Sequence, residues 1–176
     1  VYWPAMLMAA GYGPEALPRQ VFAHGFLTYA GQKMSKSLRN TVSPVALAEA
    51  ISPTVGVDAV RYALMRAISF GQDGDFSVKD LLTRYGSELG NALGNLLNRV
   101  LPFADTVPAR GPETALEEAL RATLRTGAKE AAEAFDSTMP TRALEAIWSV
   151  VLAANAYVDR AAPWVAKKED PVRLGT

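Results

Sequence analysis

The chain has 176 residues, 49% of them hydrophobic and 20% charged, which is ordinary for a globular protein of one domain or slightly more. Its 18 basic and 18 acidic residues give a formal net charge of zero, so any contact with RNA must come from a local patch or from stacking. The absence of cysteine and the single histidine exclude disulfides and a zinc site, and no apolar run reaches the roughly 18 residues of a membrane span. No signal peptide is apparent, so we expect a cytoplasmic protein.

The first forty residues predict a helix, a strand and a loop. Residues 2–10 are apolar on nearly every side and are followed by Gly11, which is typical of the end of a buried helix. Residues 21–27 are apolar and β-prone, and they predict a buried strand. A helix followed by a strand is one step of an open parallel sheet. Because one strand cannot form a sheet, we expect this chain to be a piece of a longer one.

The loop that follows contains two lysines. Residues 31–37 read Gly-Gln-Lys-Met-Ser-Lys-Ser, without the apolar period of a helix or the alternation of a strand. Lys33 and Lys36 carry ammonium groups on flexible stems, which can follow negative charge as it moves onto a leaving group. The loop therefore suits a polyphosphate ligand, although an arbitrary pair of lysines at this spacing is more often a solvated surface turn.

The rest of the chain predicts helices. Ser43 and Pro44 form a helix start, with a capping residue and proline at the first position, so residues 44–51 should be a helix. A second helix is expected over residues 58–68, and residues 70–76 should be a loop at a domain boundary. Long helices are then predicted over residues 78–101, 113–135 and 141–162, as an antiparallel bundle. The fold class is α/β followed by all-α.

Helical spacing of 100° per residue separates two sides of the first long helix. The side predicted to be buried carries Leu82, Tyr85, Leu89, Leu93, Leu96, Leu97 and Val100. The other side carries Asn91, Asn95, Asn98 and Arg99. A solvated face is the usual explanation, but asparagine is a mediocre helix former, and Asn and Arg are well suited to hydrogen-bonding bases and phosphates.

Two residues near the end of the chain raise separate questions. Asn155 lies on the apolar stripe of the last long helix, with Leu144, Ile147, Trp148, Val151, Leu152 and Val158, so its amide must find hydrogen-bond partners if it is buried. Trp164 follows that helix directly and is either a core plug, which is the commoner case, or a platform on which an unpaired base stacks.

Residues 33–37, with His24-Gly25 before them and Ser43-Pro44 after them, resemble the signature loop of class I aminoacyl-tRNA synthetases. In that family the loop closes on ATP and stabilises the pyrophosphate leaving group. The resemblance implies that Lys33 and Lys36 are catalytic and that the ATP-binding residues are His24, Lys33, Met34, Ser35, Lys36 and Ser37. Many relatives carry glycine at the position of Arg39, which puts the loop backbone in question because glycine adopts positive φ more readily.

The later motifs resemble the methionyl branch of that family. They are Asn-Leu-Leu-Asn-Arg at residues 95–99, Asn-Ala-Tyr at residues 155–157 and Pro-Trp at residues 163–164. The resemblance implies the C-terminal part of a Rossmann-like catalytic domain over residues 1–43, a connecting stem-contact region over 44–76 and an incomplete helical anticodon-binding domain over 77–176. It further implies that Asn95 and Arg99 read anticodon bases and that Trp164 stacks on one.

The implied activity belongs to the intact protein, which would form methionyl-adenylate from methionine and Mg-ATP and transfer methionine to tRNA(Met). These residues lack the family's His-x-Gly-His nucleotide motif, and a zinc site, if any, would lie outside them, so the piece alone should be inactive. The alternatives are a class I synthetase for isoleucine, valine, leucine or cysteine, or a non-catalytic tRNA-binding module. A Trp164 sealed inside the bundle, away from Asn95 and Arg99, would contradict the methionyl interpretation.

Overall fold

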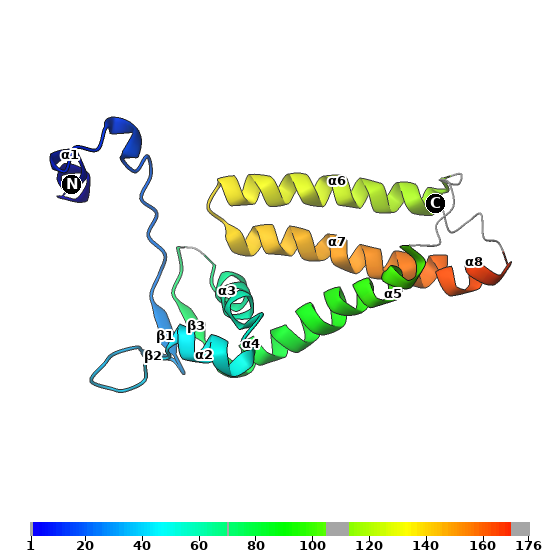
Figure 1. Ribbon diagram of the computed structural model, residues 1–176, viewed down its shortest axis with the longest axis horizontal. Coiled ribbons are helices and arrows are strands. Elements are labelled where there is room, and N and C mark those ends of the chain that lie inside the picture. Colours follow the sequence, from blue (N-terminus) through cyan, green and yellow to red (C-terminus); the bar gives the residue numbers. More distant parts are fainter. Residues whose placement is uncertain (1, 70, 105–112, 170–176) are drawn as a thin grey trace.

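The structure is a computed structural model that describes residues 2–69, 71–104 and 113–169 (Figure 1). The helices are α1 (Tyr2–Ala9), η1 (Pro14–Ala16), α2 (Pro44–Ile51), α3 (Gly56–Ala67), α4 (Val78–Arg84), η2 (Tyr85–Gly94), α5 (Asn95–Ala104), α6 (Ala115–Asp136), α7 (Pro140–Ala161) and α8 (Pro163–Glu169), and the strands are β1 (Leu27–Tyr29), β2 (Gln32–Lys33) and β3 (Gly74–Phe76). The predicted order, α/β followed by helices, is confirmed. No helix in the described ranges has the length and apolarity to cross a membrane.

The strands form a small mixed sheet in the order β2-β1-β3. β1 pairs with β2 in antiparallel fashion, with Thr28 opposite Lys33, and with β3 in parallel fashion, with Leu27 opposite Gly74. The β1–β2 turn consists of Ala30 at φ 52° and Gly31 at φ 72°, and positive φ at both central residues is the pattern of a tight hairpin turn. Two sequence predictions are therefore wrong, because Gln32 and Lys33 belong to a strand and residues 74–76 pair instead of forming a loop.

The predicted helix and strand at the start of the chain are not buried. α1 stands apart from the remaining elements in Figure 1, and Tyr2 and Trp3 are 81% and 75% exposed. Of the predicted strand over residues 21–27, only Leu27 belongs to β1. An apolar run becomes a strand only beside a partner that satisfies its backbone, and no strand within the described ranges pairs with residues 21–26.

The sheet packs against α2, α3 and α4 around a small core. The prediction for α2 is confirmed in both bounds, and Ser43 Oγ accepts a hydrogen bond from Ala46 N at 3.3 Å. The core consists of Ala48, Val60, Ala63, Phe76 and Leu81. Met34 of the lysine loop is half-buried against this core, so the loop is attached to the folded body by an apolar side chain.

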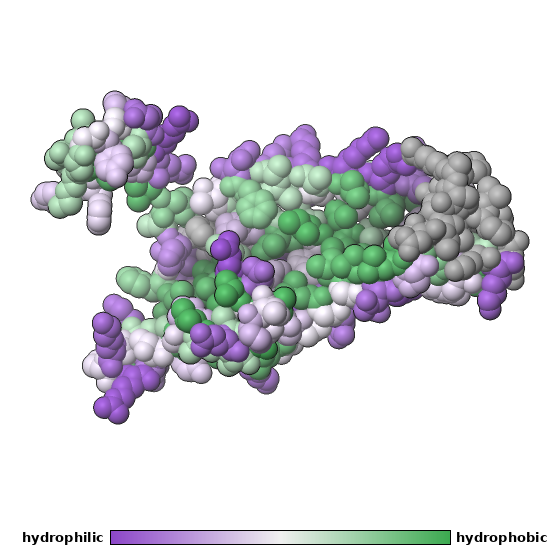
Figure 2. Space-filling view, in the orientation of Figure 1, coloured by the Kyte–Doolittle hydropathy of each residue, from purple (hydrophilic) through white to green (hydrophobic). Residues whose placement is uncertain are grey.

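The first long helix runs without a break from α4 through η2 to α5, but η2 is a π-helix of ten residues. A π-helix bonds residue i to residue i+5, so each of its turns is wider and later side chains leave the 100° spacing. The buried side predicted for this helix is wrong in part: Leu93, Leu97 and Val100, within or after the π-helix, are between 37% and 53% exposed, and Leu82, before it, is 51% exposed. Figure 2 shows apolar side chains over the surface between this helix and the α6–α7 pair.

α6 and α7 lie antiparallel, side by side (Figure 1). Thr114 and Glu117 form a capping box at the start of α6. Gly127 allows α7 to approach closely, because a Cβ there would lie 2.4 Å from Val150 Cγ2. Trp148, Val151 and Val158 of the predicted stripe are buried, whereas Ile147 and Leu152 are 39% and 61% exposed, so that prediction is correct only in part. The short helix α8 was not predicted.

A polar junction joins α3 to this helical part. Glu88 of η2 accepts hydrogen bonds from Tyr62 Oη and, at 3.2 Å, from Arg84 Nη1, while Arg66 Nη2 lies 3.7 Å from the same carboxylate. Burial, reinforced by Glu88, raises the pKa of the Tyr62 phenol, so this group stays protonated and donates. The Thr141 hydroxyl lies 2.8 Å from Met65 O and 2.7 Å from Ile68 O, so it also ties α7 to the end of α3.

The junction gives a prediction about stability. Because Glu88 is only 23% exposed, accepts two hydrogen bonds and pairs with Arg66, replacing Glu88 with Gln should lower the free energy of unfolding by about 1–3 kcal/mol. Thermal unfolding of both chains would measure the change. The matched control is Glu133→Gln, whose i,i+4 pair with Lys129 is exposed on both sides and should contribute less than about 0.5 kcal/mol. Equal losses in the two variants would contradict the role given to Glu88.

Candidate functional site

The lysine loop is closed by Asn40. Ser35 N donates to Asn40 Oδ1 at 2.8 Å, and Asn40 Nδ2 donates to Lys33 O at 3.1 Å. One side chain thus bridges the first and third residues of the Lys-Met-Ser-Lys run, as the short amide of asparagine often does in turns. The sequence analysis missed this residue, although an asparagine directly after such a loop is a recognisable turn signal.

Further contacts shape the interior of the loop. The Ser35 and Ser37 hydroxyls lie 2.8 Å apart, and Leu38 N donates to Ser35 Oγ at 3.2 Å. Arg39 adopts φ 50°, in the left-handed region. The question raised by the sequence is thereby answered, because Arg39 takes the conformation that glycine would take at lower cost.

The side chains of the loop point to different environments. Met34 is directed into the apolar core beside Leu27 and Val42. Lys33 Nζ lies 4.9 Å from the centroid of the Phe26 ring. Lys36 is exposed, and it has no ion-pair partner within residues 2–69, 71–104 and 113–169. The loop therefore presents two ammonium groups, on a fixed backbone, to a ligand that carries negative charge.

Two aspartates, Asp73 directly before β3 and Asp75 within it, hold the base of the loop. Asp73 Oδ1 accepts from Phe26 N at 2.6 Å. Asp75 Oδ1 accepts from Thr28 Oγ1 at 2.6 Å and from Gly31 N at 2.9 Å. These donors, Thr28 first, hold the pKa of the Asp75 carboxyl below its ordinary value. The sequence analysis placed both aspartates in a loop and gave them no role.

His24 precedes β1 and lies close to residues 72–75, the segment that carries the two aspartates. It is exposed, and its Nδ1 is 2.7 Å from Gly25 O. A Cβ at Gly25 would lie 2.2 Å from Gln72 O, so only glycine permits this approach of the two backbones. The segment of residues 72–75 thus fixes both the position of His24 and the base of the lysine loop.

A second cluster lies where α5 meets α7 and α8. Trp164 is 45% exposed, and Arg99 Cζ lies 5.2 Å from its ring centroid, in a cation–π arrangement. Asn95 is exposed one helical turn before Arg99. The structure therefore brings Arg99 and Trp164 together, with Asn95 on the same helix, and Trp164 is not sealed inside the bundle.

Two residues of α7 complete this cluster. Asp159 Oδ1 accepts a hydrogen bond from Arg99 Nη2 at 2.5 Å. Asn155 is half-buried and donates to both Ala92 O and Val151 O at 3.0 Å, which confirms the prediction that its amide needs partners. The sequence analysis did not associate Asp159 with Arg99, because the pair is separated by 60 residues and depends on how α5 crosses α7.

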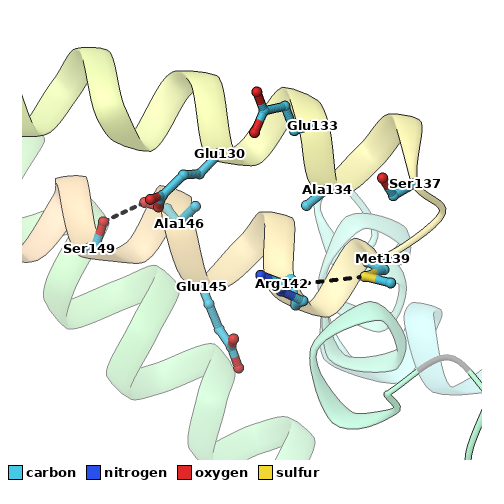
Figure 3. Close-up of a pocket in the computed structure, with 9 residues that line it drawn as sticks. All are labelled: Glu130, Glu133, Ala134, Ser137, Met139, Arg142, Glu145, Ala146 and Ser149. Carbon is cyan, nitrogen blue, oxygen red and sulfur yellow. Dashed lines mark hydrogen bonds between the residues drawn. The ribbon is translucent and has the colours of Figure 1, made fainter.

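The two clusters lie at opposite ends of the molecule (Figure 1). A cavity of about 610 Å³ opens elsewhere, near the turn between α6 and α7 (Figure 3). Its lining includes Glu130, Glu133 and Glu145, with Arg142 donating to Met139 Sδ at 3.7 Å. Three carboxylates beside one guanidinium disfavour a polyanion, so phosphate or RNA is better received at the other two sites.

Comparisons with known proteins cover the whole length of the chain. The family described as tRNA synthetases class I (M) matches residues 1–101, and the anticodon binding domain of methionyl tRNA ligase matches residues 107–175. Methionine–tRNA ligase of Mycobacterium tuberculosis is 45% identical over 97% of this chain and 32% of its own length. The ligase of Rhizobium meliloti is 42% identical over the full chain and 34% of its own length.

Solved structures show the same similarity. Mycobacterium tuberculosis methionyl-tRNA synthetase bound by methionyl-adenylate has a TM-score of 0.80 and 42% identity, over 99% of this chain and 35% of that one. The free form of the same enzyme gives a TM-score of 0.77 over the full chain and 34% of its own length. The present chain thus spans about a third of the length of its relatives. The methionyl branch is confirmed over the branches for isoleucine, valine, leucine and cysteine.

The contacts of Asp75 predict how the hairpin turn is held. Replacing Asp75 with Ala removes the acceptor of the Gly31 N–H, so exchange of this amide with solvent should accelerate several-fold. Hydrogen exchange measured on residues 28–35 reports the change, and Asp136→Ala, at the distant end of α6, is the control. In the unchanged chain the protection should be constant at neutral pH. It should be lost only as the pH falls through the lowered pKa of Asp75, when the carboxylate is protonated. Unchanged exchange in Asp75→Ala would show that other contacts hold the turn.

Proposed function

Because the chain belongs to the methionyl branch of the class I tRNA synthetase family, we propose that the protein containing it is a methionine–tRNA ligase. Such an enzyme activates methionine with ATP and transfers it to tRNA(Met), and it would act in the cytoplasm. The observation that carries the proposal is the pairing of two sites on one chain: a constrained loop with two ammonium groups, and an accessible Arg99–Trp164 pair at the far end. The present residues supply the phosphate loop and part of the RNA-reading surface.

The lysine loop would act in the first step. The methionine carboxylate attacks the α-phosphorus of ATP, the bond to the bridging oxygen breaks, and pyrophosphate leaves with the charge. Lys33 and Lys36 would stabilise that charge electrostatically. Lys36 is the stronger candidate, because Lys33 already lies over the Phe26 ring whereas Lys36 extends into solvent.

The other proposed ATP-binding residues have supporting roles. Ser35 and Ser37 would keep the loop in shape through their mutual contact, and Met34 would anchor it to the core. His24 would lie beside the adenylate, at the end of the extended segment that precedes β1. Mg²⁺ would enter bound to the ATP phosphates. A zinc site of the family would belong to residues outside this chain.

The second cluster would read the anticodon. An anticodon loop is single-stranded, so its bases can be splayed out, stacked on an aromatic ring and hydrogen-bonded at their edges. Trp164 offers a half-exposed ring for stacking, and Asn95 and Arg99 offer an amide and a guanidinium one turn apart. Asp159 would hold the Arg99 guanidinium in place by accepting one of its hydrogen bonds.

Replacing Lys36 with Ala tests the first site. In the full-length enzyme this change should lower kcat of methionine-dependent ATP–pyrophosphate exchange by about 10²–10³-fold with little change in the KM for methionine. The reason is that charge develops on the leaving group only in the transition state. Lys79→Ala removes an equally exposed lysine of α4 and should leave exchange unchanged. Similar rates for the two variants would refute the role of Lys36.

Replacing Trp164 with Ala tests the second site. Loss of one stacking surface, at about 1–3 kcal/mol per base, should raise the KM for tRNA(Met) by about 5–150-fold. Exchange of pyrophosphate should stay normal, because the two sites lie at opposite ends of the chain. Trp164→Phe keeps a ring and should recover part of the affinity. An unaffected KM in Trp164→Ala would contradict the anticodon assignment.

A further inference from the structure

Asn155 occupies a particular place between the two helices of the anticodon-reading cluster. Its side-chain Nδ2 carries two hydrogens, and both are used, one toward Val151 O on its own helix and one toward Ala92 O on η2. The second bond joins residues that are 63 apart in the sequence. It connects α7 to the continuous helix of η2 and α5, which carries Asn95 and Arg99. The Asn155 amide therefore links α7 to η2, and both of its hydrogens are used in hydrogen bonds.

The acceptor of this bond, Ala92 O, is also bonded to the backbone of Asn95. Ala92 lies in the last turn of the π-helix, and Ala92 O also receives the backbone N–H of Asn95, which is shared with Gly90 O. A π segment displaces carbonyls from the regular i→i+4 ladder, so they are accessible to a neighbouring donor. The carbonyl that Asn155 holds is therefore the one to which the backbone of Asn95 is bonded.

A second polar contact lies one turn further along α7. Asp159, four residues after Asn155, accepts from Arg99, seven residues after Ala92. One contact between two helices allows rotation about it, whereas two contacts a turn apart fix both rotation and axial position. Two apolar residues of this stretch, Leu93 and Leu97, are 37% and 53% exposed, so they are only partly packed.

We propose that Asn155 is a positioning residue for anticodon recognition: by holding Ala92 O, it sets the register of α5 so that Asn95 and Arg99 face Trp164. The inference rests on the proposed function, since it concerns the accuracy of the same site. Asn155 itself does not need to touch RNA. Asn155 acts by holding the backbone of the helix that carries Asn95 and Arg99, the residues proposed to contact RNA.

The experiment uses the full-length enzyme and compares Asn155→Leu with Tyr157→Phe. Leucine has nearly the shape of asparagine but donates no hydrogen bond. Tyr157→Phe also removes one interhelical hydrogen bond of α7, the bond to Glu117 of α6, a helix that carries none of the proposed anticodon-reading residues. Each variant is assayed for pyrophosphate exchange, for thermal unfolding, and for kcat/KM with tRNA(Met) and with the same tRNA carrying one substituted anticodon base.

We expect Asn155→Leu to reduce the ratio of kcat/KM values for the two tRNAs by about tenfold, the scale of one lost hydrogen bond, with pyrophosphate exchange unchanged. Tyr157→Phe should keep that ratio even if it lowers the unfolding temperature by the same amount. Asn155→Gln, which keeps the amide, should recover part of the ratio and also serves if the leucine variant does not fold. A merely structural role predicts the same ratio in all variants, and that result would overturn the proposal.

A parallel assay of Trp164→Ala distinguishes failure of the positioning role of Asn155 from failure of the anticodon site itself. If Trp164→Ala changes tRNA recognition but Asn155→Leu does not, the anticodon site stands and the positioning role is refuted. If neither variant changes it, the anticodon assignment fails and the role of Asn155 falls with it.

Discussion

The carboxylate of Glu88 is the point at which the two halves of this chain are joined. It lies on the π-helix, accepts hydrogen bonds from Tyr62 of α3 and Arg84 of α4, and forms an ion pair with Arg66 of α3 at 3.7 Å. These partners satisfy the partly buried carboxylate, and the raised pKa of Tyr62 keeps that phenol protonated as one of its donors. The position of the helix leading to Asn95 and Arg99 is consequently tied to the body that carries the lysine loop.

The local signals in the sequence were sufficient for most helices. Ser43 with Pro44 gave both ends of α2, and proline and glycine boundaries placed α6 and α7 within two residues of their observed ends. The lysine loop was recognisable because its residue string is rare. Trp164, which the sequence left open between a core plug and a stacking platform, is 45% exposed, and the Arg99 side chain beside it is 24% exposed.

What the sequence could not reveal depends on distant contacts. β3 is a three-residue strand whose only signal is the partner it finds at β1, 47 residues earlier. The π-helix has no period of its own to detect, and it turned Leu93 and Leu97 away from the side that regular spacing predicts. Asp75 and Asp159 are ordinary polar residues until the fold brings Gly31 and Arg99 to them, from 44 and 60 residues away. Residues 21–26 failed as a strand because β-prone composition does not provide a pairing partner.

Arg39 also affects the energetics of the loop. A non-glycine residue in the left-handed region costs about 1 kcal/mol or more, and here the turn from Lys36 O to Arg39 N and the bridge of Asn40 hold it there. A rearranged loop that returned Arg39 to negative φ would regain that energy. At about 1 kcal/mol the strain corresponds to about a fivefold preference for such a rearrangement, before any contact with a ligand is counted.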